Sequence, residues 1–164
     1  MSPVTSHLSP ALSRLWRGYQ KIRHPADLWL CLRVLGWLLA VRLLVRWVKL
    51  PLLLSWLTPL GRRGEVDQRR VDKIVSLTDT CLSVLPGSAN GRCLSRSLTL
   101  YRLLRESGLP VAVNLGLAPP VSRVTGHCWL TLAGRVVFER EDSGARLIQM
   151  LRHPGEQESG TTPQ

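Results

Sequence analysis

Cysteine is scarce in this sequence, and its spacing excludes several classes of protein. The four cysteines, Cys31, Cys81, Cys93 and Cys128, form no close pairs. The spacing therefore indicates neither a zinc site nor the disulfide framework of a small secreted domain. Residues 1–18 also lack the apolar stretch and the small-residue cleavage site of a signal peptide. We therefore expect reduced thiols and a cytoplasmic protein.

Acidic residues are the scarcer charge, with 11 Asp and Glu against 22 Lys and Arg and a net charge of +11. Most of the excess lies in residues 1–63, which hold ten Lys and Arg, one acid and five of the six tryptophans. This asymmetry predicts a basic, Leu/Trp-rich helical region at 1–63, a core domain of different character at 64–153 and a disordered tail at 154–164. The basic residues alternate with leucine and no recognition motif appears, so nucleic acid is not an expected partner.

Uncharged runs long enough to cross a bilayer are also absent. The apolar segment 28–57 contains no stretch of about 20 residues without a charge, and a central arginine costs about 3 kcal/mol on insertion scales. These features disfavour a membrane span. Two interpretations stay open: a helix pair packed on the core or on a partner protein, and a helix lying on a membrane surface. The interrupting residues are Arg33, Arg42, Arg46, Lys49 and Pro51.

Helical periodicity follows in two further segments. Residues 65–85 carry an apolar stripe that includes Cys81, so we expect an amphipathic helix with this thiol buried. Proline and glycines then predict a loop at 86–92. A second helix is predicted from Cys93 to Ser107, because Gly108 with a nearby proline is a typical helix end.

Cys93 would occupy the first turn of that second helix. Free N–H groups and the positive end of the helix dipole favour a thiolate there, and neighbouring Arg92 and Arg96 would act in the same direction. The backbone N–H of Cys93 would also be a donor for an oxyanion. A buried structural cysteine at a helix start is the other interpretation, because the apolar Leu94 adjoins it.

The period then changes from helix to strand. The pattern predicts three strands, the last two joined by a tight turn at residues 133–134, and a helix followed by an antiparallel sheet indicates an α+β core. In the middle strand His127 and Cys128 would point to opposite faces, so they could not both join Cys93 around one zinc ion. We therefore expect no metal and no other cofactor. The predicted strands are 111–118, 126–133 and 135–139.

A helix cysteine, a strand histidine and an acid on the next strand are the parts that thiol catalysis needs as nucleophile, base and orienter. The acid would be Glu139, but strict pairing across the hairpin places its side chain on the wrong face for His127. A bulge near Phe138 is therefore required. Glu141 and Asp142 are the reserve candidates, and any of these acids could equally belong to a solvated loop.

These residues carry a family resemblance. The segment "GRCLSRSLTLYRLLRESGLPVAVNLGL" followed by "GHCWLTLAGRVV" resembles the transglutaminase-like cysteine peptidase of lasso-peptide biosynthesis, the B protein, and more closely its stand-alone C-terminal half. The resemblance implies a transglutaminase/papain-like core and a Cys-His-Asp triad that falls on Cys93, His127 and Glu139. Glutamate stands where the family usually has aspartate, and Cys128 replaces the usual alanine.

The resemblance further implies a function and a set of partners. The family removes the leader from a ribosomally made precursor, so that a macrolactam-forming synthetase can close the ring. A precursor peptide is thus the expected substrate, and a separate leader-binding protein is an expected partner. Two alternatives stay open: a related transglutaminase-like amidase or acyltransferase, and a non-enzymatic basic adaptor in a peptide-maturation complex.

Overall fold

The computed structural model describes residues 25–59, 66–85, 89–118, 125–138 and 148–154. In this part of the chain, four helices precede four strands. The helices are α2 (Pro25–Trp47), α3 (Leu50–Leu57), α4 (Gln68–Val84) and α5 (Ala89–Glu106). The strands are β1 (Ala112–Ala118), β2 (Thr125–Leu132), β3 (Arg135–Val137) and β4 (Ile148–His153). This order confirms the predicted α+β class.

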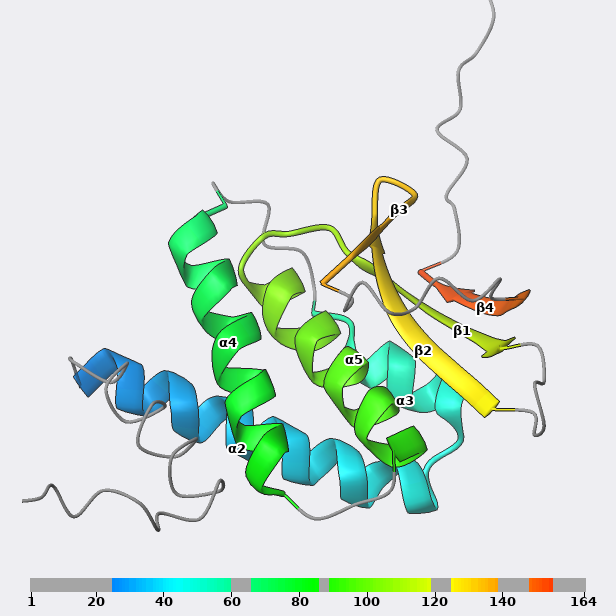
Figure 1. The fold of residues 1–164 in the computed structure, drawn as a ribbon, viewed down its shortest axis with the longest axis horizontal. Helices are drawn as coiled ribbons and strands as arrows, with labels where there is room; N and C mark the ends of the chain where they lie inside the picture. Colours follow the sequence, from blue (N-terminus) through cyan, green and yellow to red (C-terminus); the bar gives the residue numbers. More distant parts are fainter. Residues whose placement is uncertain (1–24, 60–65, 86–88, 119–124, 139–147, 155–164) are drawn as a thin grey trace, which may run out of the picture.

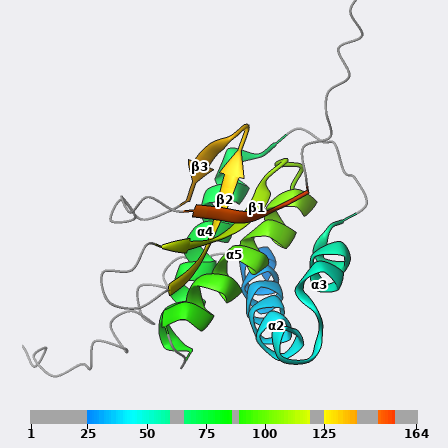
Figure 2. The ribbon, with the colours of Figure 1, turned by 90° about the vertical axis from the view of Figure 1, so that its right-hand side faces the viewer.

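The helices and the sheet form two layers. The strands lie in the order β3-β2-β1-β4, and each neighbouring pair is antiparallel. Helix α5 packs on β1 and β2, while α2 and α4 lie on the other side of α5 (Figure 1). After a turn of 90°, the strands are seen together along one side of the helices (Figure 2). The segment that runs from α5 into the sheet is therefore central to the fold.

The hairpin between β2 and β3 follows the predicted register. Ala133 and Gly134 form the tight turn with φ values of 48° and 79°, as a two-residue turn of this kind requires. Leu130 pairs with Val137 as expected. The strand ends there, and Phe138 adopts a φ of 60°. The chain thus leaves the extended conformation at the position where the prediction required an irregularity.

Strand β4 is missing from the sequence prediction. It pairs with the edge of β1 that β2 leaves open, with a register shift between Leu115 and Gly116. Its sequence, "IQMLRH", has no strict alternation of apolar and polar residues, so local pattern gave no signal. The strand forms because β1 offers unpaired N–H and C=O groups along that edge.

The N-terminal helix pair packs on the rest of the domain, as the first interpretation of segment 28–57 predicts. This packing leaves the second interpretation, a helix on a membrane surface, open. Lys49 is the N-cap of α3 and Pro51 lies in its first turn, where its missing N–H costs no helical hydrogen bond. The apolar faces of α2 and α3 join one buried cluster with α4, α5 and the sheet. Their fully buried members are Val34, Leu38, Val41, Leu53, Leu54 and Leu57. The domain boundary predicted at residue 63 and the tail after residue 154 lie outside the described residues.

Helix α2 is the one described helix that is long and apolar enough to cross a membrane, with a mean hydropathy of 2.0. Ion pairs bind it to the other helices. Asp27, buried near its start, pairs with Lys73 of α4, and Arg33 pairs with Glu106 of α5. A buried carboxylate needs such a partner to offset its loss of hydration.

Cys81 is buried, as predicted, with 8% of its surface exposed. Its sulfur lies 4.0 Å from that of Cys31 on α2. Burial, and to a lesser extent the neighbouring Cys31, raises the pKa of the Cys81 thiol to about 12. This thiol therefore stays protonated at neutral pH.

Candidate active site

Helix α5 begins earlier than predicted. It starts at Ala89, four residues before Cys93, so the placement of Cys93 in the first turn is wrong. A single glycine such as Gly91 costs a helix only about 1 kcal/mol, which packing of the helix offsets. Because only the first four N–H groups of a helix lack an intrahelical acceptor, the N–H of Cys93 is not available to an oxyanion. The charge of the helix end is also one turn away.

The two arginines beside Cys93 bind α4. Arg92 donates to the carbonyl oxygen of Leu82 at 2.9 Å, in the last turn of α4. Arg96 forms a two-point ion pair with Asp79, with distances of 2.6 and 3.2 Å. These contacts join the C-terminal part of α4 to the N-terminal part of α5. That Arg92 and Arg96 favour the thiolate form of Cys93 stays a prediction.

The structure brings Cys93 and His127 together, although they lie 34 positions apart in the chain. The sulfur of Cys93 on α5 is 3.5 Å from Nδ1 of His127 on β2. Both residues are half-buried. A thiol at this distance from an imidazole nitrogen can transfer its proton to the ring, which is the first requirement of thiol catalysis.

The imidazole of His127 is held by its neighbour on the same face of β2. Its ring stacks on that of Trp129, with 5.9 Å between centroids and 18° between planes. Trp129 is 4% exposed. Since Nδ1 faces the sulfur, Nε2, which is buried, is the nitrogen that an orienting acid would have to reach. The three candidate acids, Glu139, Glu141 and Asp142, lie outside the described residues.

The backbone of Cys128 holds the sulfur of Cys93 from two sides. Its N–H donates to the sulfur at 3.3 Å, and its carbonyl oxygen accepts from the thiol at 3.0 Å. The first contact stabilises a thiolate and the second stabilises a thiol. The side chain of Cys128 itself is buried in the core, as predicted, with 3% exposed.

Ser97 completes this arrangement, and sequence reasoning missed it. Its hydroxyl, on a residue 1% exposed, donates to the same Cys128 carbonyl at 2.8 Å. Ser97 follows Cys93 by four positions, so the two side chains share one face of α5. That spacing was the available signal. Within the described ranges, no group of three or more His, Cys, Asp or Glu side chains has the arrangement of a metal site.

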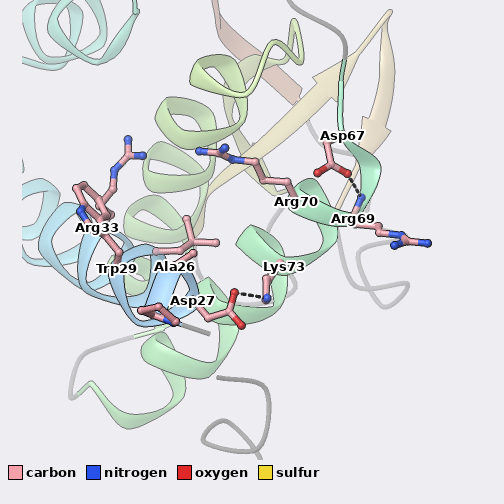
Figure 3. Close-up of a pocket in the computed structure, with 10 residues that line it drawn as sticks. Ala26, Asp27, Trp29, Arg33, Asp67, Arg69, Arg70 and Lys73 are labelled. Atoms are coloured by element: carbon pink, nitrogen blue, oxygen red, sulfur yellow. Dashed lines mark hydrogen bonds and ion pairs between the residues drawn. The ribbon is translucent and has the colours of Figure 1, made fainter. Parts of the chain in front are cut away.

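A cavity of about 630 Å³ lies elsewhere, at the N-terminal ends of α2 and α4 (Figure 3). Six of the ten residues that line it are charged. Asp27 and Lys73 point toward each other there, and Asp67 accepts a hydrogen bond from the N–H of Arg69 at 3.0 Å. At 1.5 Å per helical residue, Lys73 lies about 14 Å along α4 from Leu82, which contacts Arg92 beside Cys93. Neither Cys93 nor His127 lines this cavity.

Most of the chain matches a protein-family model. Residues 35–152 match the family model described as the transglutaminase-like superfamily. The matched range begins within α2, ends within β4 and includes both Cys93 and His127. No curated protein and no solved structure matches the chain.

Proposed function

Because this chain belongs to the transglutaminase-like superfamily, we propose that it is a cysteine peptidase that removes the leader from a ribosomally made lasso-peptide precursor. Members of the superfamily are generally cysteine-dependent enzymes. The observation that carries the proposal is the 3.5 Å distance between the Cys93 sulfur and Nδ1 of His127. The choice of substrate rests on the resemblance of residues 90–140 to the leader peptidases of this pathway.

The first step forms the acyl-enzyme. Nδ1 of His127 takes the proton of the Cys93 thiol, and the thiolate attacks the carbonyl carbon of the bond between leader and core. The N–H of Cys128, which donates to the sulfur, stabilises the thiolate before attack. The protonated imidazole then gives its proton to the nitrogen of the core peptide. The C–N bond breaks, and the leader stays bound to Cys93 as a thioester.

The second step releases the leader. His127 takes a proton from water, and the resulting hydroxide adds to the thioester carbonyl. The C–S bond breaks, and the sulfur recovers a proton from the imidazolium. An acid at Glu139, or at Glu141 or Asp142, would bind Nε2 and hold the ring in the tautomer that leaves Nδ1 facing the sulfur.

Two neighbours have positioning roles in this proposal. The ring of Trp129 limits rotation of His127 because the two rings are stacked. The Cys128 carbonyl accepts from both the Cys93 thiol and the Ser97 hydroxyl. When the thiol loses its proton, the Ser97 hydroxyl still donates to this carbonyl, which therefore does not become an unsatisfied buried acceptor. Leader recognition itself would come from the separate leader-binding protein, and the product would pass to the macrolactam-forming synthetase.

The test needs a lasso-peptide precursor and its leader-binding protein, which the proposed function expects to be encoded near the gene for this chain. Purified chain is mixed with both, and cleavage is followed by mass spectrometry. Cys93→Ala should reduce the rate by at least about a thousandfold, because the nucleophile is lost. Cys128→Ala is the matched control: it also removes a thiol near the site, keeps the backbone contacts and should retain cleavage.

The outcomes separate the proposal from its alternatives. Retained cleavage in Cys93→Ala would refute it. A thioester that is released faster by an added amine than by water would instead support the acyltransferase. If the natural chain does not cleave the precursor and Cys93 reacts with alkylating reagents no faster than an ordinary exposed thiol, this result would support the adaptor over the two enzymes.

A further inference from the structure

Helix α2 carries an apolar stripe on the face opposite the core, and this feature plays no part in the proposed chemistry. Its members recur at spacings of three to four residues or their sums, so they lie on one side of the helix. Each has half or more of its surface exposed. The stripe consists of Leu28 (51%), Leu32 (61%), Leu39 (51%), Leu43 (61%) and Trp47 (83%). An exposed apolar surface of this extent usually marks an interaction site.

Cations follow one border of this stripe. Arg42 and Arg46 each come three positions after a stripe leucine, and Lys49 follows at the helix end. Arg46 and Lys49 are exposed and Arg42 is half-buried. Asp27 is the single acid in residues 25–59, and it is buried in its pair with Lys73. The surface around the stripe therefore presents positive charge without an exposed acid in this range.

We propose that α2 lies flat on an anionic membrane, with the stripe inserted among the acyl chains and the exposed Arg46 and Lys49 at the lipid phosphates. The proposal is independent of the peptidase assignment. An apolar face bordered by Lys and Arg is the pattern of helices that bind the membrane surface. Trp47, the most exposed large apolar residue of α2, ends the stripe, and tryptophan is enriched at the membrane–water interface.

The packing of α2 favours this surface orientation over a span. Its opposite face is part of the domain core, where Val34, Leu38 and Val41 have no exposed surface. The ion pairs of Asp27 with Lys73 and of Arg33 with Glu106 hold the same helix against α4 and α5. A helix that crossed the bilayer would have to break these contacts, whereas a helix in the interface keeps all of them.

The test measures binding of the purified full-length chain to vesicles. One set contains equal parts of phosphatidylglycerol and phosphatidylcholine, and the other contains phosphatidylcholine alone. The chain should sediment with the anionic vesicles, and its tryptophan emission should shift to the blue. Changing Arg46 and Lys49 to Gln should weaken binding about fivefold for each cation removed, and added salt should act in the same direction.

The stripe itself is tested by the double variant Leu32→Glu with Leu43→Glu, which should bind anionic vesicles at least about tenfold more weakly. Both positions are exposed, so circular dichroism should report an unchanged fold. Val136→Glu is the matched control, because Val136 is 55% exposed on β3, away from α2, and binding should not change. The proposal is overturned if the natural chain does not bind anionic vesicles. It is also overturned if the double variant binds them as well as the control, or if the stripe is needed only for capture of the leader-binding protein.

Discussion

Replacing one leucine of α2 tests whether this helix is part of the folded domain. Leu38 has no exposed surface and lies in the core cluster with α4 and α5. Leu38→Ala removes buried apolar atoms and leaves a cavity, which costs about 2–5 kcal/mol. A domain of this size has about 5–15 kcal/mol of stability in total. With a urea dependence of about 2 kcal/mol per molar, the unfolding midpoint should fall by about 1–2.5 M.

The next residue in the chain provides the control. Leu39 is 51% exposed on the opposite side of the helix, so Leu39→Ala should change the free energy of unfolding by less than about 0.5 kcal/mol. Both variants are followed by circular dichroism in urea. Equal midpoints for the two variants would show that α2 does not contribute to the cooperative core, and the packing argument would fail. A large loss in Leu38→Ala alone would support it.

Two further predictions follow from perturbed groups. Because burial and Cys31 raise the pKa of Cys81 to about 12, iodoacetamide at pH 8 should label Cys93 well before Cys81, as peptide mass spectrometry can show; equal labelling rates would contradict this. Burial, and secondarily Arg105, lowers the pKa of His153 below 6.5. The unfolded chain then binds more protons than the folded one, and stability should fall as pH drops below 6.5. In His153→Gln the melting temperature should change less between pH 7 and pH 5, and an unchanged slope would contradict the assignment.

Most of the fold could be predicted from local pattern. The periodicity of segment 65–85 gave α4 within three residues at its start. The Ala133-Gly134 turn gave the register of the hairpin, because a two-residue turn fixes which residues pair. Strand β4 could not be predicted in this way. Its existence depends on the free edge of β1, which is a property of the assembled sheet.

The pairing of Cys93 with His127 could be predicted from the sequence, but the start of α5 and the backbone contacts of the sulfur could not. The residue types at Cys93 and His127 and the change from helix to strand indicated the pair, and the structure places their atoms 3.5 Å apart. The helix start was wrong because Gly91 looked like a loop residue, whereas tertiary packing extends α5 to Ala89. The contacts of the Cys128 backbone could not be seen at all, since they depend on how closely α5 approaches β2.

The two hydrogen bonds between the backbone at position 128 and the Cys93 sulfur determine which substitutions the site can tolerate. The sulfur of Cys93 is held through an amide N–H and a carbonyl, a pair of groups that every amino acid except proline provides. Exchanging the side chain at position 128 for another small one therefore alters the core beneath the sheet without moving the thiol. Ser97 has no such freedom, because its contact with the same carbonyl is made by a hydroxyl.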